Sequence, residues 1–326
     1  MKKVLIAILL LGLLPHASAD YIHWVDFRLS APVLRSALEL DMASQGGEQP
    51  LDWIDILALA AAWRGGTGVT VADTQRAAQA LRGDTPPERL PGMAGRCFSY
   101  YRAAYGAALG GLVGHFAIRR TDPQTDEAEW IPAYGLKAFS PIAAGYPWSH
   151  YPDFGAQRSY GYARPHLGND ILGALGTPIC AVEGGTVEAL GWNRYGGWRI
   201  GIRSDDRKRY YYYAHLRKDT PYAEGLAVGQ RVQAGDVIGF MGRTGYSAQE
   251  NVNNIETVHL HFGLQLIFDE SQKECDSEIW IDVYPIIELL ASHCSSVARD
   301  PQTGRWERLY PYCDLDAEPL RSAAAR

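Results

Sequence analysis

The residue pattern changes near residue 135, and this change constrains the fold more than any other feature of the chain. Before it, apolar residues recur at helical spacing between helix caps and glycine stops. After it, short runs rich in β-branched and aromatic residues alternate with glycine-containing turns. The sequence therefore predicts an α+β multidomain chain, with a helical N-terminal domain followed by a β-dominated domain built on an antiparallel sheet.

The helical part contains four runs with start and stop signals. Ser30 and Asp52 are N-cap candidates for runs that end at glycines near residues 46 and 65. Two further runs, 70–84 and 95–114, are separated by a proline-rich break. We expect residues 20–134 to form a mostly helical domain and linker, 135–290 the β-dominated domain, and 291–326 a C-terminal tail.

The first nineteen residues have the order of a secretory signal. Two lysines precede an apolar run from Val4 to Leu14 and a small-residue end at Ala17-Ser18-Ala19, which predicts cleavage after Ala19. The apolar run is shorter than the roughly 20 residues that a bilayer-spanning helix needs. We therefore expect an exported protein of the cell envelope or the extracellular space, with no stable membrane span. Loss of two lysines takes the formal charge from −6 to −8, which argues against a nucleic-acid partner.

The chain has five cysteines, and export permits disulfides among them. Cys180 lies between apolar neighbours, so we expect it to be buried as a small hydrophobic residue. Cys275, Cys294 and Cys313 lie near the C-terminus, where one bridge could hold the tail. The sequence does not determine which pair forms.

Two histidines stand one residue apart in the strand-like run ETVHLHFGLQ. Residues i and i+2 of a strand share one face, so His259 and His261 project together. His166 and Asp170 are four apart around Gly168. Each pair alone is compatible with a structural role, either as tolerated strand histidines or as a surface hydrogen bond. Imidazole and carboxylate are both good Zn²⁺ ligands, and together the two pairs favour a metal site.

A catalytic zinc site uses three protein ligands and keeps a fourth position open for water. His166, Asp170 and one histidine of the 259/261 pair supply three ligands. The remaining histidine could take the proton of the activated water. A further histidine, His215, closes the strand-like run YYYYAHL.

Four motifs in this order, HLGND, YAHL, AGDVIGFMGRTGYS and HLHFG, resemble those of the lysostaphin/LytM-type zinc metallopeptidases, peptidase family M23, over about residues 160 to 268. The resemblance implies one Zn²⁺ per chain, held by His166, Asp170 and His261. It also implies His215 and His259 as the two catalytic histidines, with His259 the better candidate for the general base and His215 for the oxyanion, although the two roles are not separable from sequence.

Tyr160 matches in spacing a tyrosine that assists some members of the family, and Tyr162 competes with it for this role. The chain departs from the family pattern at 248–258, an insertion that we expect to form a loop at the rim of the groove. A set of aromatic residues surrounds the motifs, and we expect about half of it to line the groove. The set comprises Trp192, Tyr195, Trp198 and Tyr210 to Tyr213.

The resemblance implies an exported zinc metalloendopeptidase that cuts peptide bonds in bacterial peptidoglycan, either in the stem peptide or in the bridge. Two alternatives remain: a non-catalytic wall-binding or regulatory LytM-like module, and a secreted protease that acts on glycine-rich proteins. The resemblance does not extend to the helical domain, for which wall binding, self-inhibition and a structural role stay open. Whether a partner protein controls the site is equally open.

Overall fold

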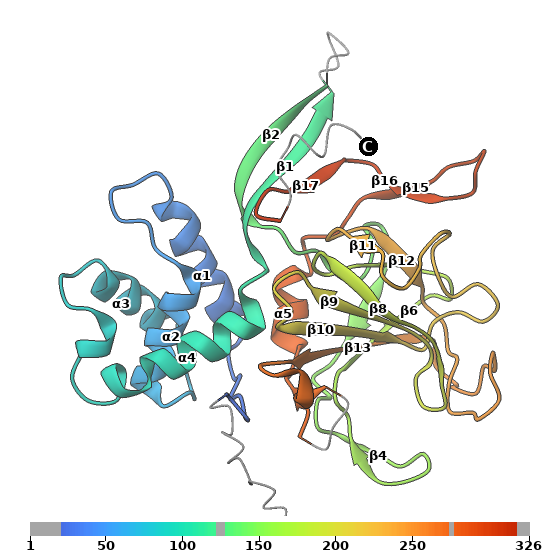
Figure 1. Ribbon diagram of the computed structural model, residues 1–326, viewed down its shortest axis with the longest axis horizontal. Helices are drawn as coiled ribbons and strands as arrows, with labels where there is room; N and C mark the ends of the chain where they lie inside the picture. Colours follow the sequence, from blue (N-terminus) through green and yellow to red (C-terminus); the bar gives the residue numbers. More distant parts are fainter. Residues whose placement is uncertain (1–20, 122–127, 274–276, 318–326) are drawn as a thin grey trace, which may run out of the picture.

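The computed structural model describes residues 21–121, 128–273 and 277–317. The expected signal at residues 1–19 and Cys275 lie outside the described residues. A helical lobe stands beside a β-rich lobe, with a β-hairpin between them (Figure 1). This arrangement confirms the α+β prediction. No helix in the described part of the chain is both long and apolar enough to cross a bilayer.

The helical lobe is a bundle of four helices, α1 (Ala31–Ser44), α2 (Trp53–Arg64), α3 (Val71–Leu81) and α4 (Met93–Leu109), with a single 3-10 turn, η1 (Pro87–Arg89). Asp52 caps α2 by accepting a hydrogen bond from the Ile54 backbone N–H, and Gly65 ends it with a left-handed φ of 62°. Most of α2 is buried, as expected for a helix that is apolar all round. It is therefore the central helix of the bundle, in contact with α1, α3 and α4.

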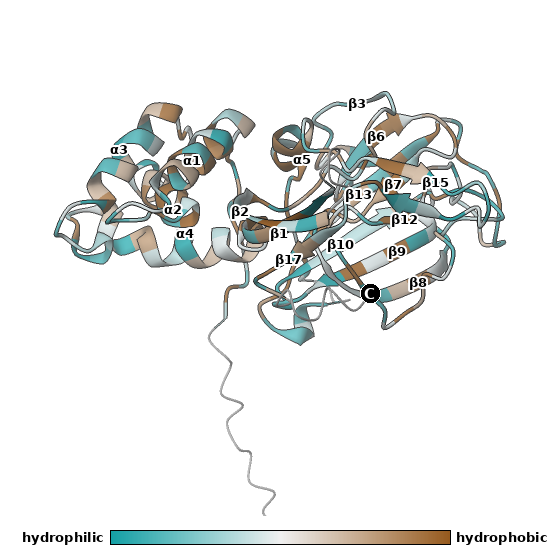
Figure 2. Cartoon of the chain, turned by 90° about the horizontal axis from the view of Figure 1, so that it is seen from above, coloured by the Kyte–Doolittle hydropathy of each residue, from teal (hydrophilic) through white to brown (hydrophobic). Residues whose placement is uncertain are grey.

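A three-stranded antiparallel sheet lies between the lobes, in the order β17-β1-β2 (Figure 2). It consists of β1 (Val113–Thr121), β2 (Ala128–Leu136) and β17 (Tyr312–Asp314). The helix expected over 95–114 thus ends at Leu109, and the chain turns into β1 through two glycines. The C-terminal region also contains the hairpin β15 (Val297–Arg299) and β16 (Trp306–Arg308).

The β-rich lobe is organised around one antiparallel sheet in the order β11-β8-β9-β10-β13-β6-β3, with β14 paired to β13. Its strands are β3 (Trp148–His150), β6 (Asn169–Gly173), β8 (Gly185–Asn193), β9 (Gly197–Ser204), β10 (Arg209–Ala214), β11 (Arg231–Val232), β13 (His259–Leu266) and β14 (Ile279–Trp280). Two small pairs accompany it, β7 (Pro178–Cys180) with β12 (Val237–Phe240), and β4 (Gln157–Arg158) with β5 (Arg164–Pro165). The turn η2 (Glu270–Gln272) and the helix α5 (Tyr284–Leu290) complete it.

The four consecutive tyrosines of β10 show how this sheet divides its two faces. Tyr211 and Tyr213 are buried in the core, and the Tyr213 hydroxyl accepts a hydrogen bond from the Val182 backbone N–H. Tyr210 and Tyr212 point to the opposite face, where they line a groove. The two-residue period of a strand thus separates core tyrosines from groove tyrosines.

Candidate metal centre

Two neighbouring strands bring the expected metal ligands together. In the antiparallel pairing of β6 with β13, Asp170 lies directly opposite His261. His166 precedes β6, and its backbone N–H donates to the Ala156 carbonyl. Between His166 and Asp170, a side chain on Gly168 would meet the Phe262 carbonyl oxygen at 2.6 Å and the His261 ring at 2.7 Å. Glycine is needed here because the backbone passes directly beside the His261 imidazole.

The three side chains converge on one point. His166 Nε2 lies 3.0 Å from Asp170 Oδ1 and 2.8 Å from His261 Nδ1. His261 Nδ1 lies 3.1 Å from the same Asp170 oxygen. One ligand atom from each residue falls within 4.8 Å of the others, so the set could hold a single metal ion. Two imidazoles and one carboxylate fit Zn²⁺, and a three-residue set is typical of a catalytic rather than a structural zinc site.

The charges of the ligands are strongly coupled. Burial would raise the pKa of Asp170, but hydrogen bonds from His166 and His261 hold it well below its ordinary value. Burial would lower the pKa of His166, but hydrogen bonds to Asp153 and Asp170 raise it to about 9. Burial lowers the pKa of His261 despite its hydrogen bond to Asp170. Without a metal ion, His166 is therefore the ligand that carries a proton at neutral pH.

A second layer of residues, not predicted from the sequence, fixes the ligands. Asp153 Oδ2 lies 3.2 Å from His166 Nδ1, and the Asn169 side chain donates to Asp153 Oδ1 over 2.8 Å. Arg158 Nη2 bridges Asp153 Oδ2 and Asp170 Oδ2, each at 3.0 Å. Such outer partners orient metal ligands and set their basicity. Asp153 and Arg158 lie outside the recognised motifs, so no sequence pattern pointed to them.

The layer continues away from the centre towards α5. His150 on β3 donates through Nδ1 to the Asn169 side-chain oxygen over 2.6 Å, and its Nε2 lies 2.7 Å from Glu288 Oε1. A continuous chain of polar contacts therefore runs from His166 through Asp153, Asn169 and His150 to Glu288 on α5. This chain limits the rotation of the His166 ring.

The other two histidines lie next to the ligands. His259 Nε2 is 3.7 Å from Asp170 Oδ1, and the His215 ring centroid is 4.7 Å from that of His259. The Nδ1 of His259 lies 2.9 Å from the Thr257 carbonyl, and the Nδ1 of His215 lies 2.9 Å from the Thr244 carbonyl. Because a carbonyl only accepts, Nδ1 is the protonated nitrogen of both rings, and Nε2 is left for chemistry.

His215 shows two further marks of a constrained site. Burial lowers its pKa well below the ordinary value, so its ring is neutral at physiological pH. Its backbone has φ of 61°, in the left-handed region that costs energy for a residue with a side chain. The hydrogen bond from Nδ1 to the Thr244 carbonyl fixes the direction of the ring just after β10.

The expected tyrosine contacts the site only through another ring. Tyr160 stacks on Tyr246 with centroids 4.6 Å apart, and Tyr246 lies 5.9 Å from the His215 ring. Tyr162, its competitor, is 57% exposed and packs against Tyr195. Tyr160 is thus linked to His215 through one intervening ring, and among the described residues it makes no hydrogen bond or ring contact with His166, Asp170 or His261.

A groove of about 270 Å³ opens beside the ligands. Three of the seven expected aromatic residues line it: Tyr195, Tyr210 and Tyr212. Trp192 and Trp198 instead anchor the loop that follows Tyr246. Their indole N–H groups donate to the Ser247 carbonyl and to the Asn251 side-chain oxygen, respectively. Asn251 lies in the 248–258 insertion and also accepts from the Asp219 backbone N–H. The insertion is therefore tied to the loop after His215.

Comparison with known proteins matches part of the chain to one family of peptidases. Residues 164–274 match peptidase family M23. The chain is 40% identical over 130 residues to an L-Ala--D-Glu endopeptidase of Bacillus subtilis (strain 168), a match that covers 40% of this chain and 38% of that protein. It is 38% identical over 98 residues to the glycyl-glycine endopeptidase ALE-1 of Staphylococcus capitis, which covers 30% of this chain and 24% of that protein.

A solved structure of lytM from Ruminococcus gnavus ATCC 29149 is 25% identical, with a TM-score of 0.47, and the match covers 82% of this chain and 91% of that one. The chain spans less than half the length of each of the two sequence relatives.

Proposed function

Because residues 164–274 match peptidase family M23, we propose that the chain is an exported zinc metalloendopeptidase that hydrolyses peptide bonds in bacterial peptidoglycan. One observation carries the proposal: His166, Asp170 and His261 converge on one point, with His259 and His215 directly beside them. The relatives named above as endopeptidases support the same reaction class.

His166, Asp170 and His261 would hold the ion. When bound, Zn²⁺ supplies Lewis acidity, which polarises the carbonyl of the scissile peptide and makes a water molecule acidic enough to attack near neutral pH. Asp153 and Arg158 keep the ligands aligned through His166 Nδ1 and Asp170 Oδ2.

The two remaining histidines manage protons and charge. In the proposed roles, His259 takes a proton from the attacking water at Nε2 and passes it to the leaving nitrogen. His215, whose ring centroid lies 4.7 Å from that of His259, stabilises the oxygen that becomes negative. Both rings present Nε2, so the geometry allows the two roles to be exchanged. Tyr160 would assist through Tyr246, on which it stacks.

Release of new amino termini from purified peptidoglycan tests the proposal. The zinc-loaded full chain should release them, and a chelator should abolish the release. Mass spectrometry of the digested muropeptides would then identify the bond. A folded, zinc-loaded sample that releases nothing from several wall chemistries would instead favour a non-catalytic wall-binding or regulatory module.

Export is part of the proposal and has its own test. Expression of the full chain with its first nineteen residues should yield a secreted or envelope product that begins at residue 20. Amino-terminal sequencing of that product would show an intact Met1 if the expectation is wrong.

A further inference from the structure

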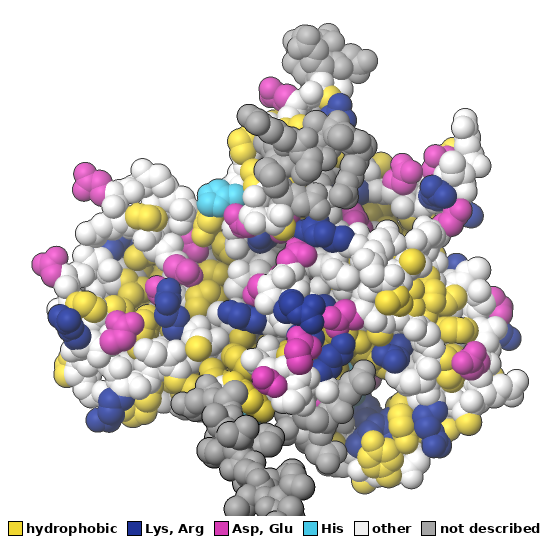
Figure 3. All heavy atoms as spheres, in the orientation of Figure 1, with side chains coloured by type: hydrophobic (Ala, Val, Ile, Leu, Met, Phe, Trp, Pro, Cys, Tyr) yellow, Lys and Arg dark blue, Asp and Glu magenta, His cyan; other side chains and the backbone are white. Residues whose placement is uncertain are grey.

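The charge of the groove differs from that of the whole chain. The chain carries a formal charge of −6, whereas the groove is lined by four basic side chains, Arg158, Arg164, Arg199 and Lys273, and by two acidic ones, Asp170 and Glu278. Figure 3 shows basic side chains next to hydrophobic ones around the loop that carries β4, at the lower right. An acidic protein with a basic groove is suited to an anionic ligand at that groove.

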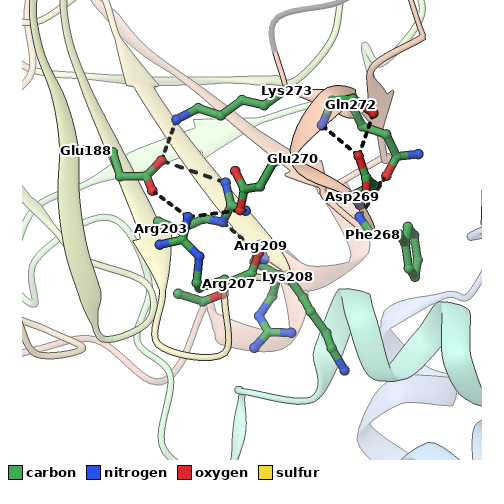
Figure 4. A network of polar contacts seen from close by, with 12 residues as sticks. Glu188, Arg203, Arg207, Lys208, Arg209, Phe268, Asp269, Glu270, Gln272 and Lys273 are labelled. Atoms are coloured by element: carbon green, nitrogen blue, oxygen red, sulfur yellow. Dashed lines mark hydrogen bonds and ion pairs between the residues drawn. The ribbon is translucent and has the colours of Figure 1, made fainter. Parts of the chain in front are cut away.

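Two of the four cations are already neutralised by the protein. Arg158 is bound to Asp153 and Asp170. Lys273 Nζ lies 2.5 Å from Glu188, within the ion-pair network that joins Glu188, Arg203 and Glu270 (Figure 4). These two side chains have structural partners, so neither supplies the unbalanced charge.

Arg164 and Arg199 have no carboxylate within ion-pair distance among the described residues. Arg164 donates to the Tyr160 carbonyl over 2.7 Å, and its guanidinium lies over the Tyr195 ring at 4.7 Å. Stacking holds the plane of the guanidinium, whose fork of N–H groups suits a planar acceptor such as a carboxylate. Tyr195 itself lines the groove.

Arg199, on β9, is half-buried, and its Nε is fully buried with no hydrogen-bond partner in the described structure. Tyr212 pairs with Gly201 on β9, two residues from Arg199, so Arg199 and Tyr212 lie on the same face of the sheet and both line the groove. The Tyr212 ring is 5.9 Å from that of the metal ligand His261. An unpaired buried guanidinium N–H is costly unless a ligand satisfies it.

We propose that Arg164 and Arg199 bind a carboxylate of the substrate, so that the chain prefers peptides with a free carboxylate beside the scissile bond over uncharged peptides such as oligoglycine. The inference rests on the proposed function and narrows it to one class of peptide. A planar guanidinium matches a carboxylate through paired N–H···O bonds, and charge-assisted hydrogen bonds are the strongest of their kind. Oligoglycine offers no such partner away from its C-terminus.

A matched pair of peptides tests the preference. Both contain the same alanyl-glutamyl sequence, but one has a free carboxylate next to the scissile bond and the other has the corresponding amide. The wild-type chain should cleave the acid with a kcat/KM about ten to a hundred times higher, the range expected for a charge-assisted hydrogen bond. Arg164→Gln and Arg199→Gln should each reduce that ratio, and the double variant should bring it close to one.

Two further variants control for misfolding. Arg194 also lies over the Tyr195 ring, at 5.2 Å, but it is exposed and does not line the groove. Arg194→Gln should keep the wild-type ratio, and Arg199→Lys, which retains the charge, should keep part of it. Equal loss of the ratio in Arg194→Gln would overturn the assignment.

Binding separates this inference from the proposed function. Calorimetry on the zinc-loaded His259→Ala variant should show the acid peptide binding at least about tenfold more tightly than the amide. Adding Arg199→Gln to this variant should reduce the difference, and adding both Arg164→Gln and Arg199→Gln should abolish it. If peptidoglycan is cleaved but acid and amide behave alike, the inference is wrong and the proposed function stands. If nothing is cleaved but the acid preference depends on Arg164 and Arg199, the inference stands and the proposed function fails. Equal binding of acid and amide, without cleavage, overturns both.

Discussion

At the scale of single residues, one carboxylate oxygen organises the centre. Asp170 Oδ1 is within 3.1 Å of both His166 and His261, while Oδ2 is held by Arg158. The convergence of His166, Asp170 and His261 could be predicted because their spacing and residue types restrict the chemistry, and their role as metal ligands stays a prediction. Asp153 and Arg158 were not, since their role depends on how the loop before β6 folds back, which no short motif records. The disulfide expected near the C-terminus stays a prediction, because Cys275 lies outside the described residues.

The pKa of His166 predicts a pH-dependent metal affinity. Asp153 and Asp170 raise this pKa to about 9, so below that pH a zinc ion must displace the proton on the ligand. Apparent affinity should therefore rise by about tenfold per pH unit up to about pH 9 and then level off, the slope for one displaced proton. Competition with a fluorescent chelator at several pH values measures it. Asp153→Asn should shift the plateau to lower pH, and a flat profile in the wild type would contradict the assignment.

Substitution of the histidines separates ligands from proton carriers. His261→Ala removes one of three ligands and should abolish stoichiometric zinc. His259→Ala or His215→Ala should leave zinc bound but slow turnover by roughly 10² to 10⁴, the usual contribution of a general acid or base. Metal analysis and peptide kinetics on the same preparations check both statements. Wild-type turnover in His259→Ala would remove it from the mechanism.

At the scale of elements, the alternation within strands was predictable and the pairing between distant strands was not. His259 and His261 lie on the same face of β13, with the buried Leu260 between them, as a two-residue period requires. By contrast, β17 pairs with β1 across almost two hundred residues, so neither strand carries a local signal for the other. The hairpin of β1 and β2 was missed for a different reason, because the helical pattern predicted over 95–114 runs into the start of β1. The predicted domain boundaries at 134 and 290 stay predictions.

The junction of β6 with β13 depends on Gly168. Its substitution by alanine would place Cβ 2.6 Å from the Phe262 backbone oxygen, which belongs to a paired strand and cannot move alone. Gly168→Ala should cost about 1–3 kcal/mol in unfolding free energy, as overpacking usually does, and should weaken zinc binding at least about tenfold. Gly106→Ala, within α4, is the control. Its Cβ would meet only the Ile54 side chain of α2, at an ordinary contact distance of 3.9 Å. Urea unfolding and zinc titration of both variants decide it, and unchanged zinc affinity in Gly168→Ala would refute the steric argument.

At the scale of the whole molecule, one buried arginine joins the two lobes. Arg209 on β10 is 1% exposed, bonds Glu183 through two N–H groups at 2.7 and 3.0 Å, and donates to the Ala107 carbonyl at the end of α4 over 2.7 Å. A side chain on Gly111 would collide with Glu183, so the chain leaves α4 through a glycine that fits against this pair. Among the described residues, those that line the groove all come from positions 158 to 280. The helical lobe is thus fixed to the β-rich lobe without contributing to the groove.

Replacement of Arg209 tests whether the lobes are stabilised as one unit. Arg209→Met leaves Glu183 buried without its cation, and the last carbonyls of α4 lose their donor. Loss of one partner of a buried pair typically costs about 3–5 kcal/mol. The free energy of unfolding in urea should therefore fall by that amount, and unfolding should separate into two transitions. Arg305→Met, at an exposed ion pair with Glu224, should change stability by less than about 1 kcal/mol. The double variant Arg209→Met/Glu183→Leu should recover part of the loss, because it removes the unpaired charge as well as the pair. If Arg209→Met instead unfolds in one transition within about 1 kcal/mol of the wild type, the lobes are held together by their apolar contacts and not by this ion pair.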